Sequence, residues 1–450
     1  MEQQPRLPLW FLPANMAIIA AAFFLGLQLG GRRIASIPEP QRSALDLVHR
    51  EILRSHVEPH EAGALIDAAI AGMVRGLADP YSRYVPPGEV QRYEEANTGH
   101  YEGIGADFRA RDDAVVLWFP MPGSPAEAAG LQPGDRLLAV GGQALDTAEQ
   151  RSRVVELVRG AAGTEVRLRI QRDGGELDVL VRRADVQSPC VKWAHFADPQ
   201  HGLGYVLLTD FHPGSCKQLL AAIDRLQQQQ PLRGLVLDLR FDGGGSFDEC
   251  IDIARAFVAS GTIVSQQRRG AEVERHAARA AECVHPTLPL VVLVNEFSAS
   301  ASEVLAGALQ DHDRAAIVGT RTHGKACVNT VYTWQDLDFR LKLTTGRYRT
   351  PNGRDIERNF GTADAGKATG GIPPDVESAV AEAQRDAIRK TLATNEVPAR
   401  WREQFAAMAA KHGFAAPMPP QPADDAQLAA ALTTLRSRAN ARAAAVPGDK

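Results

Sequence analysis

Short apolar runs alternate with amphipathic segments in the second half of the chain. Runs rich in leucine and valine at residues 204–208, 235–239 and 291–294 predict buried strands. Segments 216–226 and 248–258, which lie between them, carry apolar residues at helical spacing and predict helices. The repeated order of strand and helix is typical of a mainly parallel sheet, so we expect an α/β protein.

The pattern is different in the first half of the chain. From residue 40 to about residue 91 apolar residues recur at helical spacing, until the string DPYSRY at 79–84 interrupts them. Pro80 disfavours helical geometry at the residue before it, so a turn is expected there. Farther on, glycine-rich loops separate strand-like runs that end in the alternation at 166–170. A strand-rich module is therefore expected before the α/β region.

The N-terminus carries an apolar segment of membrane length, residues 7–30, followed by Arg32 and Arg33. Residues 16–29 suit a signal-peptide core, and with the upstream part the segment is just long enough to span a bilayer. We predict an uncleaved signal anchor within residues 1–35, with a buried helix of a soluble domain as the alternative. By the positive-inside rule the two arginines would place the body of the protein in the cytoplasm.

Composition excludes several classes of protein. The chain has 450 residues and a formal net charge of −4 with no long run of one sign, so nucleic acid is not expected as a partner. Five cysteines are scattered without a CxxC pair, and twelve histidines are equally dispersed. We therefore expect no disulfide framework, no metal site and no cofactor.

A cluster of small hydroxyl residues follows the strand predicted at 291–294. Within it, Ser300 and Glu303 form the capping-box pattern of a helix start. At a junction of strand and helix, a hydroxyl can meet backbone N–H groups and a helix dipole that favour a developing negative charge. A helix cap without catalytic duty is the alternative. Lys325 follows a second apolar run, and burial would let its amine act as the base that a serine nucleophile needs.

The string SASASEVLAGALQDHDRAAIVG, with THGK after it, resembles the signature of the carboxyl-terminal processing peptidases, the tail-specific serine proteases with a Ser/Lys dyad. The similarity extends from about residue 79 to residue 376. It implies that Ser300 is the nucleophile and Lys325 the general base. The sequence departs from the family just after the lysine, where Asn329 stands in place of a glutamine that orients the lysine.

A second resemblance lies upstream. The string GSPAEAAGLQPGDRLLAVGG at 123–142 is similar to the core of PDZ domains, which add an extended peptide to a sheet edge and capture its terminal carboxylate in a backbone loop. The resemblance implies that Gly103, Ile104, Gly105 and Ala106 form that loop, and an ordinary glycine-rich turn is the alternative. The DPYSRY turn likewise resembles a motif that precedes the PDZ domain in these peptidases.

A glycine run follows the second predicted strand of the α/β region and lacks the GxxxxGK[ST] spacing of a nucleotide-binding loop. It resembles the DLR…GG element of the same proteases, where a glycine N–H helps to form the oxyanion hole. The resemblance assigns that role to Gly244 or Gly245, together with the N–H of Ala301, because a Cβ at the glycine would obstruct the approaching carbonyl. A tight turn with no catalytic duty is the alternative. Asp238 and Arg240 are expected to pair within the fold.

The expected organisation is a multidomain α/β protein whose core has a crotonase/ClpP-like fold. Its parts are a signal anchor or transmembrane segment (1–35), an N-terminal helical region (36–98), a PDZ domain (99–186), a Ser/Lys protease core (187–380) and an alanine-rich helical tail (381–450). The resemblance implies an inner-membrane anchor with a periplasmic catalytic body, contrary to what the arginine distribution indicates.

Three functions compete. The first is a serine endopeptidase that holds substrate C-termini in its PDZ domain and cleaves through an acyl-enzyme. Its partners would be protein or peptide substrates, and an activating adaptor or lipoprotein and a homo-oligomer are compatible with it. The second is an inactive PDZ scaffold that keeps the protease fold, favoured by the departures at 326–329. The third is a Ser-His-Asp hydrolase using His323 with Asp311 or Asp313, although the chain has no GxSxG nucleophile elbow.

Overall fold

The computed structural model describes residues 36–111, 113–358 and 370–445. The predicted signal anchor at 1–35 lies outside these ranges. Within them, no helix combines the length and the apolar character that crossing a bilayer requires.

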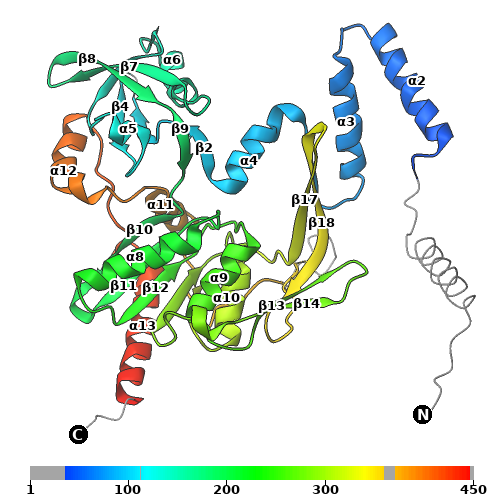
Figure 1. Ribbon diagram of the computed structural model, residues 1–450. Helices are drawn as coiled ribbons and strands as arrows, with labels where there is room; N and C mark the ends of the chain where they lie inside the picture. The colour runs from blue at the N-terminus through cyan, green and yellow to red at the C-terminus, as the bar shows by residue number, and fades with distance from the viewer. Residues whose placement is uncertain (1–35, 112, 359–369, 446–450) are drawn as a thin grey trace, which may run out of the picture. The chain divides into compact units, whose positions relative to one another are not determined.

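The chain divides into two compact units, Met1–Ala78 and Asp79–Lys450. The described part of the first unit is helical, as the periodicity predicts (Figure 1). It consists of α2 (Glu39–Ser55) and α3 (Ala62–Arg75).

An antiparallel sheet opens the second unit, with the strand order β3-β4-β5-β7-β8 and with β6 paired to β5. Inward side chains such as Leu117, Leu137 and Leu168 pack with Ala126 and Val158 of the helices into a separate hydrophobic core. Strand β3 ends the sheet, so one of its edges has no strand partner in this sheet. The strands are β2 (His100–Gly103), which pairs with β9 (Ala184–Gln187), β3 (Ala106–Ala110), β4 (Val115–Pro120), β5 (Arg136–Val140), β6 (Gln143–Ala144), β7 (Glu165–Arg172) and β8 (Gly175–Arg182). The helices are η1 (Pro87–Glu89), α4 (Val90–Thr98), α5 (Pro125–Ala128), α6 (Ala148–Ser152) and α7 (Val154–Val158).

A six-stranded sheet with the order β10-β11-β12-β15-β16-β19 forms the centre of the α/β region. The β10 strand is antiparallel to β11, whereas the other neighbours pair in parallel, as the alternation of strand and helix predicts. The strands are β10 (Val191–Asp198), β11 (Leu203–Leu208), β12 (Gly234–Asp238), β15 (Leu290–Val294), β16 (Ala316–Gly319) and β19 (Val376–Glu377).

Helices cover both faces of this sheet. Side chains that alternate along each strand pack on α8, α9 and α10 on one face, and on α11 and α13 on the other. Every residue of β11, β12, β15 and β16 is therefore buried. The helices are α8 (Ser215–Gln229), α9 (Phe247–Phe257), α10 (Ala301–Asp311), α11 (Glu382–Leu392) and α13 (Ala426–Ala445), with the short turns η2 (Pro199–His201) and η3 (Ala280–Glu282).

A second sheet adjoins the core and carries the long hairpin of β17 and β18 (Figure 1). The short strand β1 pairs with β18, placing Arg83 opposite Lys342. The segment just after the DPYS turn is therefore fixed beside the hairpin. The strands are β1 (Arg83–Val85), β13 (Thr262–Arg268), β14 (Val273–Ala277), β17 (Cys327–Trp334) and β18 (Leu337–Arg349).

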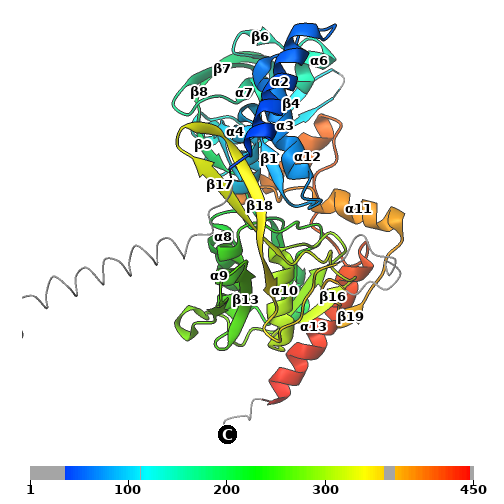
Figure 2. The ribbon, with the colours of Figure 1, turned by 90° about the vertical axis from the view of Figure 1, so that its right-hand side faces the viewer.

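The C-terminal segment contacts both sheet modules of the second unit. Helix α12 (Arg402–Lys411), preceded by η4 (Ala399–Trp401), lies against the antiparallel module (Figures 1 and 2). There Phe405 packs edge-on against Trp118, with ring centroids 4.7 Å apart. Arg400 also forms an ion pair with Glu127, at 2.5 Å. The same segment thus holds one module through α12 and the other through α13.

Candidate active site

Ser300 lies at the junction between β15 and α10. Its φ of 57° is uncommon for a residue with a side chain. The preceding loop is tied to β12, because the Ser298 hydroxyl donates to the carbonyl of Leu239 at 2.8 Å and accepts the N–H of Asn295 at 2.9 Å. These contacts fix the loop that leads into Ser300.

The carboxylate of Glu303 connects the two predicted catalytic residues. It accepts the N–H of Ser300 at 2.9 Å, of Gly324 at 2.7 Å and of Lys325 at 2.9 Å, and the hydroxyl of Thr322 at 2.6 Å. Burial raises the pKa of Glu303, and these four hydrogen bonds oppose the rise. The sequence pattern indicated Glu303 only as a cap for its own helix, whereas the structure makes it the link to a distant loop.

Tyr348 of β18 is a second connection that the sequence analysis missed. Its buried hydroxyl lies 3.1 Å from the carbonyl oxygen of Ser300 and within hydrogen-bonding distance of that of Lys325. Its backbone N–H donates to the carbonyl of Ala326 at 2.9 Å. Nothing in the one-dimensional pattern points to this tyrosine, because its role depends on tertiary contacts.

Ser300 and Lys325 line one cavity of about 430 Å³, together with the glycine run 243–245 and Asn329. Lys325 sits next to Gly324, whose φ of 92° and close approach to Arg358 favour glycine. Within the described residues no hydrogen bond joins the Lys325 Nζ to the Ser300 Oγ. The amine lies instead 5.0 Å from the centroid of the Tyr81 ring.

The glycine run lies against the nucleophile. A Cβ at Gly244 would come within 2.9 Å of the Ser300 Cβ and 2.8 Å of the Ala301 nitrogen. The N–H of Gly244 is already bonded to the Asp242 Oδ1 at 2.8 Å. In contrast, no hydrogen bond from the N–H of Gly245 or of Ala301 is found among the described residues. Their role as donors to an oxyanion stays a prediction.

Asn329 lies on the wall of the same cavity, in β17. Its amide Nδ2 donates to the Thr344 Oγ1 at 3.1 Å. No hydrogen bond from Asn329 to Lys325 is present in the described part of the chain. The role of Asn329 in orienting the lysine stays a prediction.

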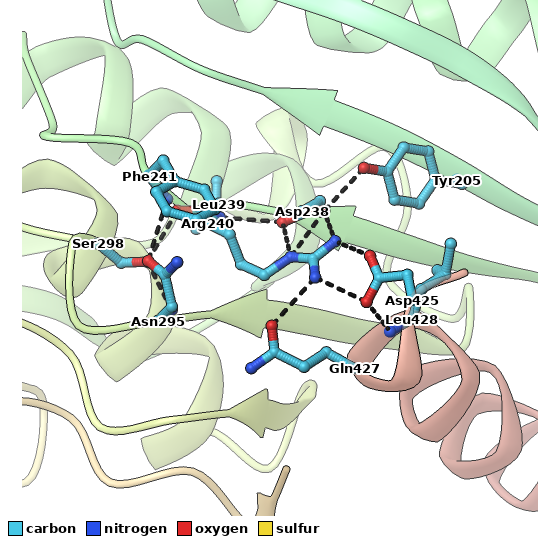
Figure 3. A network of polar contacts seen from close by, with 10 residues as sticks. All are labelled: Tyr205, Asp238, Leu239, Arg240, Phe241, Asn295, Ser298, Asp425, Gln427 and Leu428. Carbon is cyan, nitrogen blue, oxygen red and sulfur yellow. Dashed lines mark hydrogen bonds and ion pairs between the residues drawn. The ribbon is translucent and has the colours of Figure 1, made fainter. Parts of the chain in front are cut away.

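A buried network supports the strand that leads into the glycine run (Figure 3). Arg240 is 1% exposed and forms ion pairs with Asp238 at 2.6 Å and with Asp425 at 2.7 Å, which confirms that Asp238 and Arg240 pair within the fold. Burial alone would lower the pKa of Arg240, but Asp238 and then Asp425 raise it well above its ordinary value. Next along the chain, the N–H of Phe241 donates to the Asn295 side chain at 3.1 Å, so the network ends beside the nucleophile loop.

The predicted carboxylate loop joins β2 to β3. Gly105 has a φ of 68°, and a Cβ there would lie 2.5 Å from the Ser124 side chain, so glycine is required. Ile104 is buried, and its carbonyl accepts the N–H of Ala126. Ala106 begins β3, the strand whose outer edge has no partner in its sheet. Strand addition needs an edge without a strand partner, and both its use here and the capture of a carboxylate stay predictions.

The geometry gives no support to a Ser-His-Asp triad. Asp311 forms an ion pair with Arg354 at 2.5 Å and accepts the N–H of Asn352. His323 is not among the residues that line the cavity with Ser300. A larger cavity of about 1020 Å³ between the antiparallel module and α12 contains neither Ser300 nor Lys325.

Comparison with known proteins gives two matching family models, peptidase family S41 over residues 202–378 and the PDZ domain over residues 120–172. A probable CtpA-like serine protease of Staphylococcus haemolyticus is 31% identical over 347 residues, which cover 76% of this chain and 68% of that protein. The carboxy-terminal processing protease CtpA of Bacillus subtilis is 29% identical over 360 residues, 78% of this chain and 75% of that protein. The solved structure of the photosystem II D1 C-terminal processing protease is 30% identical, with 74% of this chain and 86% of that chain covered and a TM-score of 0.42.

Proposed function

Since the chain belongs to the C-terminal processing proteases of peptidase family S41 and contains a PDZ domain, we propose that it is an endopeptidase that cleaves peptide bonds with a Ser300/Lys325 dyad. One observation carries the proposal: the carboxylate of Glu303 binds the N–H groups of both residues at 2.9 Å. Through this shared acceptor, the backbones of Ser300 and Lys325 are held close together beside the cavity that both residues line.

The chemistry follows from this arrangement. The neutral amine of Lys325 accepts the Ser300 proton as the Oγ attacks the substrate carbonyl. The N–H groups of Gly245 and Ala301 receive the negative charge that develops on the carbonyl oxygen. The lysine then gives its proton to the departing amine, and a water molecule deprotonated by the same amine hydrolyses the acyl-enzyme.

Substrate selection is assigned to the PDZ module. A substrate C-terminus would pair with the free edge of β3 and place its carboxylate at Gly103, Ile104, Gly105 and Ala106. We also propose that the apolar segment at 7–30 anchors the protein and that the catalytic body faces the periplasm. An activating adaptor or lipoprotein and a homo-oligomer belong to the same proposal.

A PDZ scaffold without proteolytic activity is the second candidate. It is favoured by the position of the Lys325 Nζ at the Tyr81 ring and by the bond of Asn329 to Thr344. Neither contact contributes to an assembled dyad.

Cleavage of an unfolded reporter protein tests the proposal. Wild type should cleave it, and Ser300→Ala and Lys325→Ala should each lose at least about 1,000-fold in kcat, as expected when a nucleophile or its base is removed. Equal cleavage by wild type and Ser300→Ala would overturn the assignment, and no cleavage by wild type would favour the scaffold. Circular dichroism would verify that the variants are folded.

A further inference from the structure

The turn Asp79–Ser82 is a motif to which the proposed function gives no role. Its Asp79 carboxylate accepts the N–H of Tyr81 at 3.0 Å and the hydroxyl of Ser82 at 2.5 Å. Burial acts to raise the pKa of Asp79. Hydrogen bonds with Ser82, Tyr81 and Thr344 and the charge of Lys325 act against burial and lower the pKa, so the carboxylate is ionised near neutral pH. The charged carboxylate of Asp79 therefore stabilises the conformation of the turn.

The same turn is fixed to the hairpin that follows Lys325. The Ser82 Oγ accepts the N–H of Thr344 at 3.1 Å. Pairing of Arg83 with Lys342 continues the attachment along β18. The position of Tyr81 relative to the cavity is thus set by its attachment to β18.

The ring of Tyr81 receives the lysine amine. The Lys325 Nζ lies 5.0 Å from the ring centroid, within the range of a cation–π contact. Burial raises the pKa of Tyr81 to about 12, so the phenol is neutral at working pH. An aromatic face attracts an ammonium group far more strongly than a neutral amine, and a general base has to be neutral.

The charges near the amine come from several elements. Glu303 of α10 and Glu357 carry negative charge beside Tyr81, as does Asp79. Burial lowers the pKa of Lys342, and the charge of Lys325 lowers it further, which places a second amine nearby on β18. Cys327 and His323 also lie near Lys325. Four further titratable residues line the same cavity: Tyr93, Asp210, His212 and Tyr348.

We propose that Tyr81 is a latch, a positioning residue that holds the Lys325 ammonium at its ring and away from Ser300 in the resting enzyme. Substrate binding then exchanges this contact for one between the amine and the Ser300 hydroxyl. The inference rests on the proposed function, because it assigns Tyr81 a task only if Lys325 is the base.

The first test needs no proteolysis. In a Ser300→Ala background, the acetylation of Lys325 by acetic anhydride is followed as a function of pH by mass spectrometry, with the exposed Lys390 as the internal control. Tyr81→Leu should move the half-maximal labelling of Lys325 to lower pH by about half to one unit. Tyr81→Phe, which keeps the ring, should leave it in place. An unchanged profile in Tyr81→Leu, or a shift to higher pH, overturns the latch.

The second test uses the reporter protein. Tyr81→Leu should raise kcat/KM at pH 7 by about three- to tenfold and move the acidic limb of the pH profile to lower pH, whereas Tyr81→Trp should move the limb the other way. A lower rate with an unmoved limb in folded Tyr81→Leu would mean that Tyr81 supports the active arrangement, and the latch would be wrong. If wild type does not cleave at all, the proposed function fails, while the labelling experiment still decides whether Tyr81 holds the amine.

Discussion

The guanidinium of Arg240 and the carboxylate of Asp425 lie 2.7 Å apart in a buried ion pair that joins the end of β12 to the start of α13. Arg240 is 1% exposed and Asp425 4% exposed, so neither charge is screened by water. A buried charge that loses its partner costs far more than an exposed one. The end of the β12 strand, from which the glycine run departs, therefore depends on a residue in the C-terminal segment.

Replacement of Asp425 should destabilise the second unit. Asp425→Ala removes one of the two carboxylates that bind Arg240, and we expect the free energy of unfolding to fall by about 3 kcal/mol. Urea denaturation measures the change. The exposed neighbour Asp424 is the matched control, since Asp424→Ala should alter stability by less than about 0.5 kcal/mol. Equal effects of the two variants would contradict the importance of the ion pair.

Glu303 should be needed for catalysis although it is not proposed to touch the substrate. Glu303→Gln conserves the volume but keeps only one of the two acceptor oxygens. In either orientation of the amide, its NH₂ group opposes an N–H donor, either that of Gly324 or those of Ser300 and Lys325. We expect kcat/KM for the reporter to fall by about 100-fold, as misplacement of a catalytic group by about 1 Å does. The control is Glu382→Gln, whose side chain is 83% exposed on α11. A loss smaller than about threefold would show that the bridge is dispensable.

Removal of the Tyr348 hydroxyl tests the second connection between Ser300 and Lys325. Tyr348→Phe keeps the buried ring and loses only the group that contacts the Ser300 and Lys325 carbonyls. We expect a stability loss of about 1 kcal/mol, typical of one hydrogen bond, and about a tenfold lower kcat. Tyr332→Phe at an exposed position of the hairpin should change neither quantity. If both variants behave alike, the hydroxyl does not position the dyad.

Lengthening Asn329 tests the departure from the family glutamine. In Asn329→Gln the added methylene lets the amide reach past Thr344 into the cavity, where it can orient Lys325. We expect kcat to rise several-fold, by the order of magnitude that improved positioning of a base supplies. Steady-state kinetics on the reporter measure this. An unchanged or lower kcat would indicate that Asn329 already fulfils the role.

His195 should make stability depend on pH. Burial lowers its pKa from 6.5 to about 4. Between these values the unfolded chain binds a proton that the folded chain does not bind, so the free energy of unfolding decreases as pH falls from about 6.5 to about 4, by at most about 3 kcal/mol. His195→Gln lacks this contribution. Urea denaturation at pH 7 and pH 4.5 should therefore give a smaller difference for the variant, and equal differences would contradict the prediction.

The central strands could be predicted from the sequence because each is a continuous apolar run. Strands β12 and β15 are buried on both faces, and such strands leave a local pattern that does not depend on distant residues. Ser300 and Lys325 could be named as candidates from the sequence, since the small-residue run and the following lysine form a motif, and the structure places both on one cavity. The strands next to the proposed active site were therefore the easiest part of the fold to predict from the sequence.

Contacts between distant segments left no such pattern. In the sequence, Glu303 has the pattern of an ordinary helix-capping glutamate at the N3 position. Its hydrogen bonds with the N–H groups of Gly324 and Lys325 form only because the loop after β16 folds back onto α10. The partner of Arg240 lies 185 residues away in a segment of unremarkable composition. For the proposed oxyanion donor the sequence offered Gly244 and Gly245 equally. The preference for Gly245 in our proposal rests on the hydrogen bond from the N–H of Gly244 to Asp242.

The covering of the sheet by α13 has a consequence for biosynthesis. Arg240 leaves the ribosome 185 residues before Asp425, and until α13 emerges one face of β11, β12 and β15 is only partly covered, by α11. The nascent chain cannot complete its core, or fix the strand behind its nucleophile loop, before translation has passed this helix. Under the proposed function, proteolysis would therefore have to wait until α13 has been synthesised, which would protect the growing chain from its own activity.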